Sequence, residues 1–203
     1  MEQADVSIEG LANMIIPKLL RAGVGERPLI FITHSLGGLI AKRLLAKCAA
    51  APPSSPERSI ERATAGAVFY STPHFGSPLA YITKPAVVVV KPSRLTIELL
   101  PNAPFLYQLN DSFQSLSIPC ISFGETLPTA LVNNAFQISG LSWSSAVVPL
   151  ESAYPGFGKF VVLDNIDHVM SCKPESRAAS SYAATVDFLK QVLQSLRGDS
   201  KVG

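Results

Sequence analysis

A short apolar run that leads directly into a serine and then a helix is the feature that most restricts the fold of this chain. Residues 28–32, Pro-Leu-Ile-Phe-Ile, are typical of a strand buried inside a parallel sheet. Two polar residues and Ser35 follow, and helix-forming residues then continue over Leu36–Cys48. Ser35 is therefore predicted to lie on a sharp turn between a buried strand and a helix.

Such a turn prepares a serine for nucleophilic attack. It holds the serine backbone in a strained conformation, so the residues two positions away must be small. Gly37 meets this requirement on the helix side, whereas Thr33 stands where the motif prefers glycine. The turn exposes the Ser35 hydroxyl at the carboxyl edge of the sheet, and the Leu36 N–H points at the developing oxyanion. A serine that only caps the helix is the alternative, and strand, His-Ser-x-Gly-Gly and helix in direct succession favour the nucleophile.

The rest of the chain alternates between strands and helices. Further strands are predicted at 65–70, 118–123 and 160–163, and further helices at 8–23, 95–109 and 178–196. Pro17 is expected to kink or shorten the first of these helices, and Pro101 and Pro104 to break the second. This alternation indicates βαβ units, and hence a mostly parallel sheet flanked by helices. With 203 residues the chain is expected to form a single domain, 1–203. The long polar loop from Glu125 to Val147 is expected to be functional.

Composition excludes several classes of protein. Seventeen Lys and Arg against fifteen Asp and Glu give a net charge of only +2, which does not favour a nucleic-acid partner. Three cysteines with no CxxC pair argue against a disulfide framework. The longest apolar run, 86–90, is far shorter than the roughly 20 residues that span a bilayer. Neither a metal-binding histidine spacing nor a dinucleotide fingerprint is found in the sequence.

Three histidines could act as the general base beside Ser35. In folds with this turn the order along the chain is serine, acid, histidine. His168 follows the last predicted strand and fits that order. His74 comes before any suitable acid, and His34 is expected to face away from the nucleophile.

The acid that orients His168 has two candidates. Glu125 directly follows the third predicted strand, where this carboxylate usually sits, and Glu151 is the second choice. Asp164 and Asp167 lie too close to His168 in sequence to be its usual partner. A site of this kind requires no cofactor.

Several segments together resemble one family, the serine active site-containing proteins, which are lipase-like α/β-hydrolases. They occur in the family's order between about Pro28 and Leu193. The matching segments are 33–42 (THSLGGLIAK), 69–77 (FYSTPHFGS), 125–129 (ETLPT), 147–153 (VVPLESA), 167–168 (DH) and 171–174 (SCKP).

The resemblance implies a serine esterase or lipase-like enzyme of lipid metabolism. Its substrates would be acyl esters of phospholipids, and its reaction hydrolysis or acyl transfer. The implied setting is mitochondria and the endoplasmic reticulum, with phosphatidylglycerol remodelling and cholesterol handling as the linked processes. Membrane association would come from N-terminal regions that this chain does not include.

The chain also departs from the family pattern at its beginning. Only one predicted helix precedes Pro28, so the strands that normally come before the nucleophile strand, and the loop that supplies a second oxyanion donor, are missing. We therefore expect the C-terminal part of an α/β-hydrolase domain, truncated at its N-terminus. A non-catalytic module that binds a lipid or a protein is the alternative. Amide or thioester hydrolysis would use the same residues, and the sequence leaves the oligomeric state open.

Overall fold

The computed structural model describes residues 7–78, 93–128 and 147–199. Most of the long polar loop predicted between Glu125 and Val147 lies outside these residues. The elements follow in the order α1 (Ile8–Arg21), β1 (Leu29–His34), α2 (Leu36–Ala50), α3 (Glu57–Ala63), β2 (Thr64–Tyr70), α5 (Arg94–Glu98), α6 (Pro104–Gln114), β3 (Cys120–Glu125), α7 (Leu150–Ala153), β4 (Lys159–Leu163), the 3-10 turn η2 (Met170–Cys172) and α8 (Ser180–Asp199).

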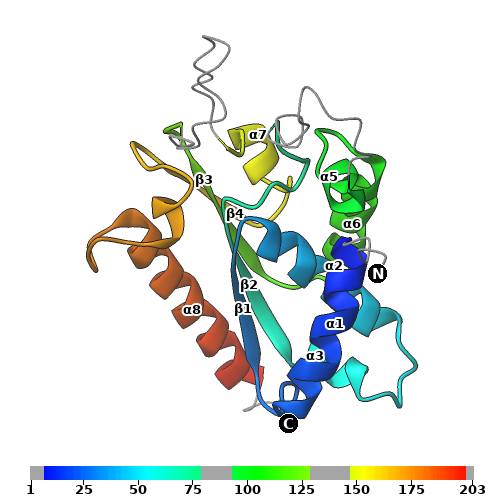
Figure 1. Ribbon diagram of the computed structural model, residues 1–203. Helices are drawn as coiled ribbons and strands as arrows, with labels where there is room; N and C mark the ends of the chain where they lie inside the picture. The colour runs from blue at the N-terminus through cyan, green and yellow to red at the C-terminus, as the bar shows by residue number, and fades with distance from the viewer. Residues whose placement is uncertain (1–6, 79–92, 129–146, 200–203) are drawn as a thin grey trace.

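The four strands form one parallel sheet in the order β1-β2-β3-β4 (Figure 1). The register aligns His34 with Tyr70, and Tyr70 with Phe123, so the strands end at the same edge. Residues that directly follow the strands are therefore neighbours in space although they are far apart in sequence. The predicted parallel sheet flanked by helices is confirmed.

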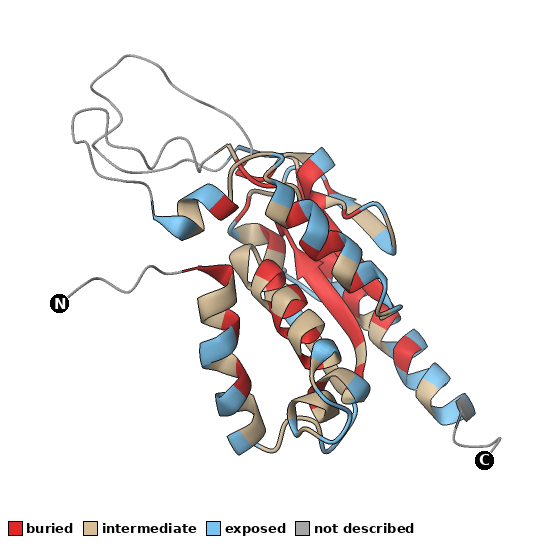
Figure 2. Cartoon of the chain, turned by 90° about the vertical axis from the view of Figure 1, so that its right-hand side faces the viewer, coloured by how far each residue is buried: buried red, intermediate tan, exposed pale blue. Residues whose placement is uncertain are grey.

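Helices cover both faces of the sheet, and alternate residues of the strands point to opposite faces. On one side α8 packs over the sheet, and the buried side chains there include Val68, Tyr70, Ile121 and Phe123. On the other side lie α1, α2, α3 and α6 (Figure 1). Figure 2 shows the resulting pattern, with buried residues along the strands and exposed residues on the outer sides of the helices.

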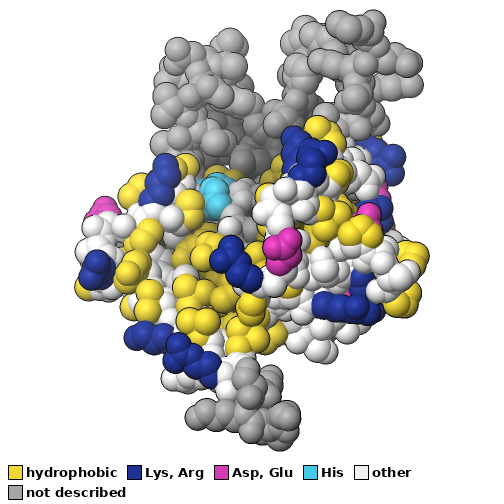
Figure 3. All heavy atoms as spheres, turned by 90° about the horizontal axis from the view of Figure 1, so that it is seen from below, with side chains coloured by type: hydrophobic (Ala, Val, Ile, Leu, Met, Phe, Trp, Pro, Cys, Tyr) yellow, Lys and Arg dark blue, Asp and Glu magenta, His cyan; other side chains and the backbone are white. Residues whose placement is uncertain are grey.

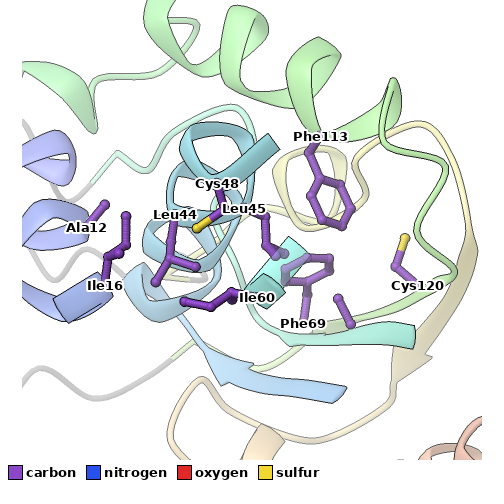
Figure 4. Close-up of a cluster of buried hydrophobic side chains, with 10 residues drawn as sticks. Ala12, Ile16, Leu44, Leu45, Cys48, Ile60, Phe69, Phe113 and Cys120 are labelled. Atoms are coloured by element: carbon purple, nitrogen blue, oxygen red, sulfur yellow. The ribbon is translucent and has the colours of Figure 1, made fainter. Parts of the chain in front are cut away.

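The larger core lies between the sheet and the layer formed by α1, α2, α3 and α6. Its side chains come from α1, α2, α3 and α6 and from the strands β2 and β3. Figure 4 shows the Phe69 ring next to that of Phe113. These two rings meet edge to face, with their centroids 5.5 Å apart. Its buried members are Ala12, Ile16, Leu44, Leu45, Cys48, Ile60, Ala67, Phe69, Phe113 and Cys120.

The N-terminal helix α1 begins as its sequence predicts. The Ser7 hydroxyl accepts a hydrogen bond from the Gly10 N–H at 3.0 Å and caps the helix. Pro17 does not end α1, which continues to Arg21. The buried carboxylate of Glu98, at the end of α5, accepts the Ile8 N–H at 2.7 Å and anchors the start of α1.

Candidate active site

Ser35 occupies the turn between β1 and α2 with a backbone conformation that few non-glycine residues adopt. Its φ is 54° and its ψ is −129°, a strained combination of the kind that concentrates at functional sites. The Ser35 N–H donates to the Tyr70 carbonyl at 2.8 Å, which extends the pairing of the two strands. The Ser35 side chain does not cap α2. The hydroxyl is thus available for another partner.

Close packing around this turn restricts the size of the residue at a different glycine from the one that the motif suggests. A Cβ on Gly37 would meet only the Thr33 Cβ, at 3.9 Å, which is an ordinary contact. A Cβ on Gly38 would lie 2.1 Å from Thr72 Oγ1 and 2.6 Å from its Cγ2. The expectation that Gly37 is the constrained position is therefore wrong. Thr33 fits in place of the motif's glycine, and its hydroxyl donates to the Val68 carbonyl at 2.9 Å.

Three side chains meet at the carboxyl edge of the sheet and form a continuous hydrogen-bonded chain, the Ser35–His168–Glu125 cluster. His168 Nε2 lies 3.0 Å from Ser35 Oγ, and His168 Nδ1 lies 3.0 Å from Glu125 Oε1. Ser35 follows β1, Glu125 ends β3, and His168 lies in the segment after β4. Because a carboxylate only accepts, Nδ1 carries the hydrogen, and Nε2 is left to accept from the serine hydroxyl.

Glu125 is fully buried and held as the ionised partner of His168. The Val148 N–H donates to the same Oε1 atom at 3.0 Å. Burial raises the pKa of Glu125, but the hydrogen bond from His168, the nearby Ser71 hydroxyl and the electrostatic interaction with the imidazole lower it by more. The net pKa is therefore below its ordinary value. Glu151, the other candidate acid, is exposed on α7. The structure thus brings Glu125 to His168.

Comparison with known proteins reveals relatives in sequence. The chain is 35% identical to the human protein SERAC1 over 191 residues, which is 92% of this chain and 27% of that protein. It is also 35% identical to SERAC1 of Danio rerio over 197 residues, covering 95% of this chain and 28% of that protein. The chain therefore spans little more than a quarter of the length of these relatives. No protein-family model matches it.

Solved structures with the same fold are lipases and phospholipases. Phospholipase PlaB from Legionella pneumophila superposes with a TM-score of 0.62 at 14% identity, covering 97% of this chain and 52% of that one. The mature form of the Bacillus licheniformis lipase BlEst2 also gives 0.62 at 14% identity, covering 93% and 75%. The chain has an α/β-hydrolase fold and is related to the SERAC1 proteins. The resemblance found in the sequence is confirmed.

Within this α/β-hydrolase fold, Ser71 is a site residue that sequence reasoning missed. It directly follows β2, is fully buried, and has a left-handed backbone with φ 47°. Its N–H donates to the Phe123 carbonyl at 2.8 Å. Its hydroxyl lies near the Glu125 carboxylate and helps to lower the pKa of Glu125. Among the described residues, neither Ser71 Oγ nor Glu125 Oε2 makes a hydrogen bond of ordinary length. The common edge of parallel strands was the signal that could have found it.

The two remaining histidines have different places in the α/β-hydrolase fold. The expectation that His34 faces away from the site is wrong, because its ring lies against that of His168 with centroids 4.7 Å apart. His34 is the last residue of β1. The alternation of side chains along the strand therefore does not by itself predict the direction of its ring. His74 is buried inside the core, edge-on to Phe69 at 5.2 Å, and does not belong to the cluster.

The loop that carries His168 is tied to the end of β3. The N–H groups of Thr126 and Leu127 both donate to the Ile166 carbonyl, at 3.2 and 3.0 Å. After the histidine, the Ser171 hydroxyl donates to the His168 carbonyl at 2.8 Å. These bonds fix the backbone on both sides of His168, so the imidazole approaches Ser35 from a defined direction.

Leu36, the predicted oxyanion donor, is the first residue of α2. The first four N–H groups of a helix have no acceptor within that helix, and the helix dipole makes this end positive. An N–H in this position is suited to a developing negative charge next to Ser35.

Two further features of the described residues bear on ligands and membranes. No group of three or more histidine, cysteine or acidic side chains with metal-binding geometry is found within residues 7–78, 93–128 and 147–199. In the same part of the chain, no helix combines the length and the apolar character needed to cross a membrane.

Proposed function

We propose that this chain is a serine hydrolase or acyltransferase of acyl esters, with Ser35 as nucleophile, His168 as general base and Glu125 as the acid that orients it. The observation that carries the proposal is the hydrogen-bonded chain from Glu125 through His168 to Ser35, with 3.0 Å at each step. The strained backbone of Ser35 adds to it, since such strain at a turn between strand and helix is typical of activated nucleophiles.

The geometry supports an acyl-transfer cycle that needs only these side chains. Ser35 Oγ attacks the ester carbonyl carbon while its proton moves to His168 Nε2. The resulting imidazolium is stabilised by the Glu125 carboxylate at Nδ1. When the tetrahedral intermediate collapses, the leaving alcohol takes the proton from Nε2, and the acyl group stays on Ser35. Water or a second alcohol, deprotonated by His168, then releases the acyl group.

The Leu36 N–H is proposed as an oxyanion donor in both halves of this cycle. A fixed N–H at the positive end of a helix stabilises the transition-state oxyanion without reorganising. One such donor typically contributes on the order of 10²–10³-fold in rate.

Phospholipid esters are the proposed substrates. The support is similarity to a phospholipase and a lipase in fold and to the SERAC1 proteins in sequence. The family resemblance also underlies a proposed role in lipid remodelling at mitochondrial and endoplasmic reticulum membranes.

Labelling of the purified chain with a fluorophosphonate tests the nucleophile and its partners together. The chain should label at Ser35, and both Ser35→Ala and His168→Ala should abolish labelling. Glu125→Ala should slow it by roughly 10²-fold or more, because the imidazole loses its orientation and its charge partner. Glu151→Ala is the matched control and should label at the wild-type rate. Loss of labelling in Glu151→Ala with retention in Glu125→Ala would reverse the assignment of the acid.

A non-catalytic binding module is the second candidate, and the edge of the sheet is the observation that favours it. β1 is an outer strand of the described sheet, and Ile32 within it is 56% exposed. Figure 3 shows hydrophobic side chains gathered over the middle of the face seen from below. A free strand edge can pair with another chain. A folded wild-type chain that does not react with fluorophosphonate would favour this candidate.

A further inference from the structure

The main-chain carbonyl of His168 accepts hydrogen bonds from two side chains of very different origin. Ser171, which donates at 2.8 Å, is only three residues further along the same loop. His34 Nε2, at 2.9 Å, comes from the end of β1 and directly precedes Ser35 in the chain. The second bond therefore ties the loop that carries the general base to the strand that carries the nucleophile.

His34 is well placed to hold this bond. A carbonyl oxygen only accepts, so the hydrogen of the His34 ring is on Nε2. The ring also packs on that of His168, with centroids 4.7 Å apart and planes tilted by 46°. Burial lowers the pKa of His34, and the bond to the His168 carbonyl only partly opposes this. A neutral ring at neutral pH does not repel the positive charge that His168 acquires during the reaction.

We propose that His34 is a positioning residue for the base. Its Nε2–H, bonded to the His168 carbonyl, sets the distance between His168 Nε2 and Ser35 Oγ. The expected effect on rate rests on the proposed function. The effect of the bond on the position of His168 does not, because it is present whether or not the chain is catalytic. Because displacement of a catalytic group by about 1 Å can cost on the order of 10²-fold in rate, a single hydrogen bond at this point has a measurable effect.

Two amide substitutions separate the hydrogen bond from the bulk of the ring. Glutamine places an N–H donor the same number of bonds from Cα as His34 Nε2, whereas asparagine carries the same amide one bond short. We expect His34→Gln to keep the rate of fluorophosphonate labelling within about threefold of wild type, and His34→Asn to lose about tenfold or more. The loss should fall in the maximal rate, kinact, with the half-saturating concentration, KI, unchanged. Circular dichroism and urea unfolding establish that both variants are folded.

A second readout separates failure of this inference from failure of the proposed function. The ring signals of His168 are followed by NMR in the wild type, His34→Asn and His34→Gln. A shift or broadening in His34→Asn that glutamine reverses supports the positioning role. Equal labelling rates and unchanged His168 signals in a folded His34→Asn would overturn it. If the wild type does not label at all, the proposed function fails, and the NMR comparison alone decides the role of His34.

Discussion

At the scale of single residues, two serines at the carboxyl edge of the sheet share an unusual backbone. Ser35 follows β1 with φ 54°, and Ser71 follows β2 with φ 47°. The left-handed region costs a residue with a Cβ roughly 1–2 kcal/mol. At Ser35 this conformation directs the hydroxyl to His168. At Ser71 it accompanies a buried hydroxyl near Glu125, so both strained positions lie beside the Ser35–His168–Glu125 cluster.

Substitution of Ser71 should move the acid limb of the labelling profile. The pKa of Glu125 is lowered in the folded chain, so the carboxylate remains ionised as the pH falls towards that lowered pKa. Ser71→Ala removes this hydroxyl and raises the pKa of Glu125. The coupled Glu125–His168 pair should then take up a proton, and labelling should be lost, at a higher pH. Ser71→Gly should produce the same shift in pH. Its unfolding free energy should exceed that of Ser71→Ala by about 1 kcal/mol, because glycine adopts positive φ without strain.

The measurement is the labelling rate as a function of pH, together with urea unfolding at neutral pH. Ser112, which is partly exposed on α6, offers Ser112→Ala as a control that should leave the acid limb in place. An acid limb that stays in place in both Ser71 variants would mean that the Ser71 hydroxyl does not act on Glu125.

The positions of the candidate site residues were predictable where they follow chain order and unpredictable where they depend on packing between neighbouring strands. Ser35 and His168 were found from a local motif and from the order of the strands. The choice between Glu125 and Glu151 depended on burial and on the Val148 N–H, which the sequence does not reveal. Ser71 was missed because Glu125, the carboxylate near it, lies on the neighbouring strand.

At the scale of elements, the start of α2 is packed closely against the segment that follows β2. Gly38→Ala would place a Cβ 2.1 Å from Thr72 Oγ1 and 2.9 Å from its Cβ. We expect a loss of about 1–3 kcal/mol in unfolding free energy, as is typical of overpacking. Gly37→Ala is the matched control in the same helix turn, and it should raise stability by up to about 1 kcal/mol because alanine favours the helix.

Urea unfolding of both variants tests this packing. Adding Thr72→Ala to Gly38→Ala removes two of the three closest atoms and should restore part of the lost stability. Equal stability of Gly37→Ala and Gly38→Ala would show that α2 can shift at no cost, against the close approach seen here.

The helices also show how far element prediction reaches. The helical segment expected over 95–109 is broken as its prolines predict, into α5 and α6. Pro101 lies between the two helices, and Pro104 begins the second. The strands were located to within a few residues, since short apolar runs between polar turns are distinctive. Which helix covers which face was not predictable from these local patterns.

At the scale of the whole molecule, Lys42 is a buried amine that links several elements. It is 1% exposed, and its Nζ donates to Asn110 Oδ1 on α6 at 2.6 Å. Asn110 Nδ2 in turn donates to the Pro155 carbonyl, before β4, at 2.7 Å. The ammonium also lies 5.3 Å from the ring centroids of Phe69 and Phe113. A residue of α2 thus connects the helical layer to the sheet and to the segment before β4.

Lys42 should make the stability of the whole fold depend on pH in one window. Burial lowers its pKa from 10.5 to about 7. Between these values the unfolded chain binds more protons than the folded one, so stability rises with pH by up to about 1.4 kcal/mol per unit. The neighbouring His74, with its pKa well below 6.5, acts below this window. Cys120, with a pKa raised from 9.0 to about 11, acts above pH 9.

Urea unfolding between pH 7 and 9 isolates the contribution of Lys42. The wild type should become more stable across this range, and Lys42→Met, which keeps the length of the side chain without the charge, should show a flatter profile. The exposed Lys190 provides Lys190→Met as a control that should follow the wild type. Parallel profiles of wild type and Lys42→Met would mean that the amine stays protonated. In that case the aromatic rings and Asn110 would stabilise the charged amine by more than burial destabilises it. The ammonium group would then hold α2, α6 and the sheet together.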